Sequence, residues 1–411
     1  MKTFLLEQLK KVLRVLAILT IRKYEPSIIG ITGTAGKTST KEAIYAVLKK
    51  ERFVRVAGKS FNNELGLPLT ILGDWQKIEG IFFWPKVLLI SVWNLIRKNK
   101  YPEILILEYG VQKPGDMAYL LGIARPSIGV MTAFHEVPAH IEFFASAEGM
   151  MREKIKLLQA VPAAGFIILN ADDATIVKAG DGLRSQVMTF GYGASAHVRV
   201  TNFENLFTEE RPLGISFKIN YGGSFVPVRF EGVAGKAQSY AAAAGACAGF
   251  IFGLNLIKIS ESLSREYRPA AHRMAIVSGI NGSYVFDDSY NAAPLSMHAA
   301  LETLGSFPAI RRIGILGDMR ELGKYSLPAH EEVGHFSAKI LDLLITIGAQ
   351  GKIIAEGAMA EGMNKKNIRS FDSVAETSEE VKNILRKGDL VLIKASRAVG
   401  LDKVVDELRV T

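Results

Sequence analysis

The sequence of 411 residues contains only one cysteine, Cys247. A single cysteine cannot form an internal disulfide, so the chain has no disulfide framework, as is usual in a reducing compartment. The sequence also lacks a strong excess of one sign of charge, because 50 Lys and Arg residues against 41 Asp and Glu residues leave a net charge of +9. This mild basic excess is compatible with anionic small molecules, nucleic acid or a membrane surface, and does not choose among them.

Uninterrupted apolar runs of membrane-spanning length are missing as well. In residues 1–26 the longest uncharged stretch is 15–21, which is too short to cross a bilayer. Residues 80–96 are nearly long enough, but Pro85 and Lys86 interrupt them. We therefore predict amphipathic or interfacial helices at both places, and neither a membrane span nor a secretory signal.

Apolar residues make up 48% of the chain and charged residues 22%, which excludes a disordered or collagen-like protein. The length indicates two or three domains. Short apolar runs alternate with helical patterns in the first half, which predicts a mostly parallel sheet covered by helices. We expect strands at 27–30, 104–107, 128–131 and 166–169 and helices at 38–50 and 147–158. Residues 187–230 alternate in polarity and predict antiparallel strands, followed by an Ala-rich helix at 238–252.

A segment with proline and several charges, residues 265–273, marks a domain boundary. A second alternation follows it, with strands expected at 284–286, 312–316, 343–347 and 390–393 and helices at 294–304, 330–341, 378–386 and 401–408. This pattern is typical of a smaller doubly wound, Rossmann-like unit. The predicted fold is therefore α/β, with a central P-loop ATPase domain, a mostly parallel sheet and a smaller C-terminal domain. The predicted boundaries are 1–26 for an N-terminal amphipathic helix, 27–267 for the central domain with an apolar insertion at 79–100, and 268–411 for the C-terminal domain.

The sharpest local signal lies between the first strand and the first helix of the central domain. Residues 30–38 read GITGTAGKT, a variant P-loop in which Ile31 replaces the usual first glycine. Small residues let backbone N–H groups converge on phosphate oxygens, and a lysine and a threonine follow for phosphate and Mg²⁺. The alternative is a glycine turn before an ordinary helix. We predict nucleotide binding by Gly33, Thr34, Ala35, Gly36, Lys37, Thr38 and Ser39.

Eight further segments follow the P-loop in a fixed order: FNNELGLPLT at 61–70, LEYG at 107–110, PGD at 114–116, AHIEFF at 139–144, ILNADD at 168–173, FDDSYNAAP at 286–294, GILGDMRELG at 314–323 and KASR at 394–397. Together they resemble the Mur ligase family, ATP-dependent amide-forming enzymes of cell-wall precursor synthesis. The resemblance extends over about residues 28–405, nearly the whole chain.

The resemblance implies two Mg²⁺ ions and a carbamylated lysine beside the ATP phosphates. Lys37 would hold the phosphates, Thr38 the first Mg²⁺, and Glu108 and His140 would be metal ligands. Lys154 falls where the family has its carbamylated lysine, whose carboxylate-like group can bind a cation. The ordinary alternatives are a strand-end acid, a core histidine and a lysine on a helix surface.

Residues of the C-terminal domain complete the implied site. Arg273 would reach the γ-phosphate and Asp288 the ribose hydroxyls, with Asn291 also at the nucleotide. The implied catalytic group is Lys37, His140, Lys154 and Arg273, and the implied substrate contacts are Asn62, Asn63, Ser396 and Arg397. For Ser396 and Arg397 the alternative is that they only cap a strand.

The resemblance implies an ATP- and Mg²⁺-dependent ligase that forms an acyl phosphate and passes the acyl group to an amine. The runs 288–291 and 317–319 favour the branch that adds D-alanyl-D-alanine to a peptidoglycan precursor. The alternatives are a related ligase of the folylpolyglutamate or cyanophycin type and a P-loop NTPase switch. The expected partners are a small or precursor-linked peptide substrate and an amino acid or dipeptide, without nucleic acid. We expect a cytoplasmic monomer, with contact at the inner face of the membrane as a further hypothesis.

Two features depart from the family pattern. Only about thirty residues precede the P-loop, where relatives of this branch carry a UDP-binding domain, so we expect this domain to be absent. Gln238 and Ala241 stand where relatives usually have asparagines. In place of the extra domain, we expect helices at 1–23 and 80–96 to lie side by side on one side of the central sheet. Their aromatic residues would either form an interfacial belt or pack as core.

Overall fold

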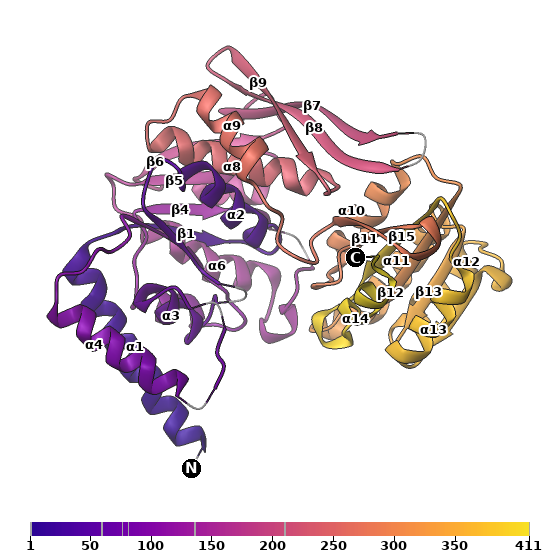
Figure 1. Cartoon of the computed structure of the whole chain (residues 1–411), viewed down its shortest axis with the longest axis horizontal. Helices are drawn as coiled ribbons and strands as arrows, with labels where there is room; N and C mark the ends of the chain where they lie inside the picture. Colours follow the sequence, from indigo (N-terminus) through magenta and orange to yellow (C-terminus); the bar gives the residue numbers. More distant parts are fainter. Residues whose placement is uncertain are drawn as a thin grey trace.

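A computed structural model describes residues 2–58, 61–75, 77–80, 82–134, 137–208 and 211–410. Two sheets organise the described chain. The first has nine strands in the order β2-β3-β1-β4-β5-β6-β7-β8-β9, and the second has six in the order β10-β11-β15-β12-β13-β14. Figure 1 shows each sheet with its helices as a separate unit, the two units lying side by side. The predicted α/β fold with a large and a smaller unit is confirmed.

The first sheet is parallel from β2 to β7 and antiparallel from β7 to β9. Its strands are β1 (Ser27–Thr32), β2 (Val54–Val56), β3 (Ile104–Glu108), β4 (Ile128–Met131), β5 (Phe166–Asn170), β6 (Gln186–Gly191), β7 (Val198–Phe207), β8 (Pro212–Tyr221) and β9 (Ser224–Glu231). The prediction that antiparallel strands begin at residue 187 is wrong for β6, which pairs in parallel with β5. Its outer half is exposed, which gives it the alternating polarity of an antiparallel strand.

Helices cover both faces of this sheet. The helices α2 (Lys37–Leu48), α8 (Lys236–Ile251) and α9 (Leu256–Glu266) share one apolar core, while α3 (Gly66–Leu72), α5 (Asp116–Leu121), α6 (Ala147–Gln159) and α7 (Ala174–Gly180) contribute to the other. The Ala-rich helix α8 packs very closely on α2. A Cβ atom at Gly245 would lie only 3.0 Å from the Ala43 carbonyl carbon, so the small residues are needed for this contact.

Two apolar helices lie together beside this unit, α1 (Lys2–Tyr24) and α4 (Phe83–Ile96) (Figure 1). The Lys23 ammonium donates hydrogen bonds to the carbonyl oxygens of Asn94 and Leu95 at 2.9 and 3.0 Å, which ties the ends of the two helices together. The predicted pairing of these helices is confirmed for the described residues, which leave out Met1 and Ile81. No helix in the described part of the chain has the length and apolar character needed to cross a membrane.

The second sheet is parallel except at its edge, where β10 runs antiparallel to β11. Its strands are β10 (Ala275–Ser278), β11 (Tyr284–Asp287), β12 (Arg311–Gly317), β13 (Leu343–Ile347), β14 (Ile368–Phe371) and β15 (Asp389–Lys394). Its α-helices are α10 (Pro294–Gly305), α11 (Ser326–Ala338), α12 (Gly351–Ala360), α13 (Val374–Ile384) and α14 (Asp402–Leu408). Of these elements, β10, β14 and α12 were not predicted.

The chain passes from the first unit to the second through residues 267–274. The second unit begins with backbone contacts back to the first, because the Ala234 N–H donates to the Met274 carbonyl at 2.9 Å and Ile276 N–H to Gly232 at 2.8 Å. The linker also contains His272 and Met274 with φ of 61° and 53°, a backbone region that is costly for non-glycine residues. The connection is therefore a defined structure.

Candidate active site

The loop between β1 and α2 turns tightly beside the end of β4. Gly33 and Gly36 have φ of 145° and 79°, and a Cβ atom at Gly33 would lie 2.1 Å from the Thr132 hydroxyl oxygen. Only glycine fits at this position. Lys37 begins α2, and its ammonium donates to the Gly33 carbonyl at 2.9 Å. The lysine is thereby folded back over the loop at the helix N-terminus, where anions are favoured.

Two adjoining cavities of about 870 and 830 Å³ open at this loop, between the two units. They share wall residues from both units, namely Thr34, Ala35, Gly36, Thr38, Ala139, Arg273 and Asn291. The first cavity extends toward α8 and α10, and the second toward β3, α6 and the end of β15. We refer to them below as the first and the second cavity.

Every residue predicted for the site lies on the wall of one or both cavities. The first cavity is lined by the loop residues with Ser39, Arg273, Asp288 and Asn291. The second is lined by Gly33, Lys37, Thr38, Asn62, Asn63, Glu108, His140, Lys154, Arg273, Asn291, Ser396 and Arg397. Residues up to 364 positions apart are thus brought together, although their individual roles stay predictions.

Positive charge accumulates in the second cavity. Burial, with a smaller contribution from the nearby positive charge of Lys37, lowers the pKa of Lys154 to about 7, while Glu153 opposes the shift. Burial also lowers the pKa of Lys37, where Glu108 opposes the shift and Arg273 adds to it. Cations that lower one another's pKa in a confined space favour an anionic ligand between them.

Glu108 ends β3 and is buried, 5% exposed. Its carboxylate lies 3.4 Å from the ammonium of Lys41, which also donates to the Ala57 carbonyl at 2.9 Å. Sequence reasoning missed Lys41. The available signal was its position one helical turn after Lys37, which places both lysines on the same side of α2.

His140 lies at the junction of the two units. It has a φ of 70°, and its Nδ1 contacts the carboxylate of Glu321 from the second unit without a hydrogen bond of normal geometry. Burial lowers the pKa of His140, and the Glu321 charge opposes this shift. The His140 side chain is 27% exposed and lines the second cavity, so the ring is not enclosed in a core, and its role as a metal ligand stays a prediction.

The donor set of the second cavity suits an ion that also binds phosphate. Mg²⁺ is usually held by one or two protein oxygens together with phosphate and water. Thr38 and Glu108 provide a hydroxyl and a carboxylate on the same wall, and His140 Nδ1 is a buried nitrogen without a hydrogen bond. Within the described residues, no group of three or more His, Cys, Asp or Glu side chains is arranged to hold a metal by itself.

Arg273 stands on the linker between the units. Its guanidinium lies over the Tyr290 ring, 4.0 Å from the centroid, and its carbonyl accepts a hydrogen bond from Gln238 Nε2 at 3.0 Å. Gln238 also accepts one from the Tyr267 hydroxyl at 2.5 Å. The buried glutamine that departs from the family pattern therefore ties the linker to α8. Ala241 lies on the wall of the first cavity.

Two charged residues of the first cavity, the buried Lys394 and the exposed Asp172, were missed in the sequence. Lys394, 2% exposed, contacts the Asp288 carboxylate and donates to the Asn291 carbonyl at 3.0 Å. Asp172 accepts hydrogen bonds from the Tyr192 and Gly193 N–H groups and the Tyr240 hydroxyl, at 2.6, 2.8 and 2.7 Å. Both residues lie in segments quoted in the sequence analysis, 168–173 and 394–397, but nothing local in the sequence distinguishes them from their neighbours.

The predicted substrate residues also have structural partners. Asn63 Oδ1 accepts the Gly66 N–H at 3.0 Å at the start of α3, and Ser396 Oγ accepts the Arg320 N–H at 2.8 Å. Asn62 accepts the Gly110 N–H through its carbonyl at 2.8 Å, and the Arg397 guanidinium lies 5.3 Å from the Tyr290 ring centroid. These contacts hold the second cavity's rim in shape.

Comparison with known proteins places the chain in a family. Residues 31–82 and 90–248 match the Mur ligase middle domain, and residues 272–397 match the Mur ligase, glutamate ligase domain. A UDP-N-acetylmuramoyl-tripeptide–D-alanyl-D-alanine ligase of Mycobacterium leprae is 30% identical over 93% of this chain and 73% of its own length. The ligase of the same name from Bacillus subtilis is 29% identical over 93% and 75%.

Solved structures agree with this assignment. A MurF ligase of Thermotoga maritima, crystallised in complex with ADP, superimposes with a TM-score of 0.79 and 25% identity, over 97% of this chain and 83% of that one. MurF from Acinetobacter baumannii, at 22% identity and the same TM-score, has the same fold. The fold and the phosphate loop define a nucleotide-dependent ligase. The chain belongs to the Mur ligase family.

Proposed function

We propose that the protein joins the carboxylate of a peptidoglycan-precursor peptide to the amine of D-alanyl-D-alanine at the expense of ATP. The names of the relatives and the ADP complex of the Thermotoga maritima structure support this substrate class. The observation that carries the proposal is the convergence of Lys37, Lys154 and Arg273 on one cavity beside the phosphate loop.

The reaction transfers one phosphoryl group and forms one amide bond. A substrate carboxylate oxygen attacks the γ-phosphorus, the bond to the β-phosphate oxygen breaks, and ADP leaves. The amine then attacks the acyl-phosphate carbonyl carbon, loses a proton, and phosphate departs with the electrons of the C–O bond. Lys37 and Arg273 would offset the charge that develops on the phosphoryl oxygens. Asp288, held by Lys394, would accept hydrogen bonds from the ribose hydroxyls.

We infer that the second cavity holds Mg²⁺ at two positions, the first through Thr38 and Glu108 and the second through His140 and a carbamylated Lys154. Bound Mg²⁺ would neutralise phosphate charge during transfer. Carbamylation requires a neutral amine, and a pKa near 7 leaves a large neutral fraction of Lys154 at neutral pH. We place this activity in the cytoplasm, where ATP is available, and in a monomer.

The test is ADP release with UDP-N-acetylmuramoyl-tripeptide in the presence and absence of D-alanyl-D-alanine. The expected result is release only when both are present. Release with glutamate and a folate would indicate the folylpolyglutamate alternative, and release with ATP alone would indicate a P-loop NTPase switch. Lys37→Met, which keeps the aliphatic stem, should abolish release while the circular dichroism spectrum stays unchanged.

A further inference from the structure

The helix α1 presents an apolar face to solvent on the side away from the sheet. Phe4, Val15 and Leu19 are 66%, 55% and 42% exposed and recur at helical spacing, together with exposed Leu5 and Val12. The opposite side of the helix is buried against the unit through Leu13, Leu16, Ala17 and Thr20. An amphipathic helix normally buries its apolar side and exposes a polar one. Here the exposed side also carries large apolar residues, interspersed with Gln8, Lys11 and Arg22.

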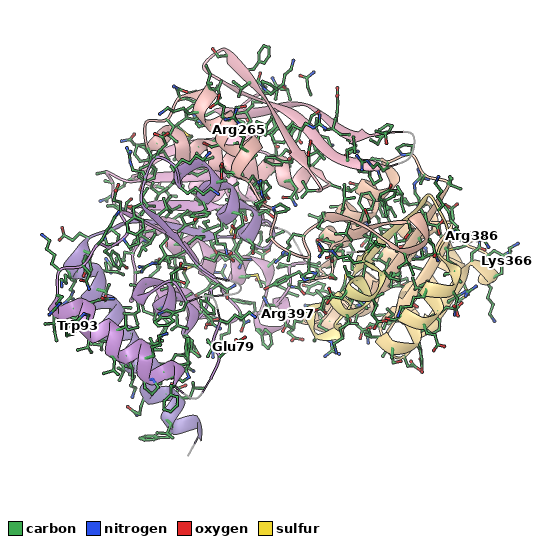
Figure 2. All side chains as sticks on the ribbon, viewed as in Figure 1. Glu79, Trp93, Arg265, Lys366, Arg386 and Arg397 are labelled. Atoms are coloured by element: carbon green, nitrogen blue, oxygen red, sulfur yellow. The ribbon has the colours of Figure 1, made fainter. Side chains whose placement is uncertain are left out.

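The helix α4 repeats this arrangement. Phe82, just before it, and Leu89, Trp93 and Ile96 within it are 80%, 72%, 52% and 74% exposed, while Phe83, Val87 and Ser91 are buried. Figure 2 shows Trp93 at the outer edge of the molecule. Phe83 packs as core, as one of the two predicted alternatives has it, whereas Phe82 and Trp93 are exposed to solvent and leave the interfacial belt a prediction. We call the exposed apolar residues of α1 and α4 the outer face.

The two segments that carry the outer face are rich in basic residues, of which Lys11, Arg22, Lys86, Arg97, Lys98 and Lys100 are exposed. Lys10, Arg14 and Lys23 contact other parts of the protein. Residues 2–24 contain six Lys or Arg and one Glu, and residues 82–100 contain four Lys or Arg and no acid. These two segments together hold a net charge of +9, which equals the net charge of the whole chain, so the remainder is neutral. The net positive charge of the sequence therefore comes from the two segments that carry the outer face.

We propose that the outer face is a docking surface for an anionic lipid bilayer, on which α1 and α4 lie flat. Apolar side chains with flanking Lys and Arg bind bilayer interfaces through buried area and attraction to anionic lipid. Trp and Phe suit the head-group level. Docking between two copies of the chain would oppose two patches of the same charge, which is unfavourable. The charge of the face therefore favours an anionic surface over self-association.

The same helix connects the outer face to the second cavity. Lys10 pairs with Glu64, and the Arg14 guanidinium lies 5.1 Å from the Tyr119 ring centroid. Glu64 and Tyr119 are both wall residues of the second cavity. Bilayer docking would thus place α1, which contacts the rim of the second cavity, at the lipid surface. The second unit lies away from α1 and α4 (Figure 1). The proposal goes beyond the ligase function and does not depend on it.

The experiment measures co-sedimentation of the full chain with vesicles of phosphatidylcholine alone and with added phosphatidylglycerol, without any substrate. We expect binding to the phosphatidylglycerol vesicles at low salt and at least about tenfold weaker binding at high salt, where the charges are screened. We also expect a blue shift of tryptophan emission that Trp93→Phe reduces. Because no substrate is present, failure of the ligase proposal leaves this result unaffected.

Matched variants locate the binding surface. Leu89→Glu with Ile96→Glu should reduce binding at least about tenfold, whereas Ile310→Glu, at an 84% exposed position of the second unit, should not. Lys86→Glu with Lys98→Glu should also weaken binding, whereas Lys366→Glu with Arg386→Glu, at the far end of the second unit in Figure 2, should not. All these positions are exposed, so the variants are expected to fold.

Three results would overturn the proposal. The first is absence of binding to phosphatidylglycerol vesicles at low salt. The second is binding that the outer-face variants leave unchanged, which would place the contact elsewhere. The third is a concentration-dependent dimer, in sedimentation equilibrium, that Leu89→Glu abolishes while vesicle binding stays weak, which would assign the face to a second copy of the chain.

Discussion

At the scale of single residues, Lys154 is the side chain whose environment is hardest to explain without a ligand. It is 3% exposed on α6, it lies near the positive charge of Lys37, and burial holds its pKa at about 7. A buried amine beside another cation is unfavourable. Conversion to a carbamate would reverse its charge and turn an unfavourable neighbour of Lys37 into a favourable one.

We predict that Lys154→Ala reduces ADP release by about 100-fold or more, as is usual when an electrostatic group of a transition state is removed. Acetate or formate should restore part of the activity, because a small carboxylate can occupy the space of the carbamate. In the unmodified chain, isotope-labelled bicarbonate should give a carbamate signal in NMR spectra that the variant lacks.

Lys156→Ala is the control for this prediction, because Lys156 lies on the same helix, is 43% exposed and pairs with the buried Glu153. It should keep both the activity and the carbamate signal. A fully active Lys154→Ala variant, or an unmodified Lys154 in the active protein, would contradict the prediction.

A second residue, His330, forms a hydrogen bond with the loop at residues 317–323. It is fully buried on α11, its Nε2 accepts the Met319 N–H at 2.8 Å, and its Nδ1 lies 2.7 Å from the Ser326 carbonyl. This arrangement needs the neutral ring with the proton on Nδ1. Burial correspondingly lowers the pKa of His330 below its ordinary value of 6.5.

We predict that this histidine makes the protein less stable in mild acid. Below about pH 6.5 the unfolded chain binds a proton at this histidine that the folded chain does not bind. The free energy of unfolding therefore decreases as the pH is lowered, by at most about 1.4 kcal/mol per pH unit for one proton. His330→Leu should be less stable at pH 8, by about 1–3 kcal/mol, because two polar groups lose their partner. Its stability should fall less steeply between pH 7 and pH 5. Parallel urea-denaturation profiles of the two proteins would contradict this.

Site residues could be predicted where they belong to one of the motifs that follow one another in the sequence. They could not be predicted where their role depends on contact with another side chain. The motifs marked Lys37, Glu108 and Asp288, and the parallel strands bring them to the same edge of their sheets. Lys41 and Lys394 were missed because a lysine that neutralises a buried carboxylate looks, in the sequence, like any surface lysine. Only the tertiary contact distinguishes them.

At the scale of elements, buried strands and long helices could be predicted, and short or edge elements could not. The runs at 104–107 and 390–393 are apolar throughout because both faces of their sheets are covered. By contrast, β14 lies at a sheet edge and is only partly buried, so its sequence carries no such run. The pair α1 and α4 was predictable from composition, but which of its aromatic residues are exposed was not.

The junction of α1 and α4 depends on Lys23. Its ammonium donates to carbonyl groups in the last turn of α4, which have no partner within the helix. We predict that Lys23→Met loosens this turn, with several-fold faster hydrogen exchange in residues 93–100 and a loss of about 1 kcal/mol or less in the free energy of unfolding. The exchange is measured by mass spectrometry of peptides.

Lys98→Met provides the comparison for Lys23→Met, since Lys98 is exposed at the same end of α4. It should leave the exchange of residues 93–100 unchanged. Equal acceleration in both variants, or none in Lys23→Met, would show that the packing of α1 on α4 holds the turn without the lysine.

At the scale of the whole molecule, the candidate active site lies where the two units meet. Apart from the linker, the units touch on either side of the cavities. On one side, Asn205 Nδ2 donates to Ser306 Oγ at 2.7 Å. On the other, Glu321 contacts His140, and the Glu142 N–H donates to the Glu321 carbonyl at 3.4 Å. Because Arg273 and Asn291 line both cavities, a change in the angle between the units would alter the nucleotide and substrate sites together.

We predict that Glu321→Ala shifts the protein toward more open arrangements when no nucleotide is present. The contact between the Glu321 carboxylate and the His140 ring is partly exposed, and such a contact contributes about 0–1 kcal/mol, so the ratio of closed to open forms should fall by at most about fivefold. Dyes on Arg265→Cys and Lys366→Cys, exposed on different units in Figure 2, report the separation by energy transfer, and the fully buried Cys247 is not labelled. A non-hydrolysable ATP analogue with Mg²⁺ should reduce the difference, because it contacts both units.

Glu356→Ala, on the exposed side of α12, should match the parent protein, and identical transfer distributions for Glu321→Ala and the parent would contradict the prediction.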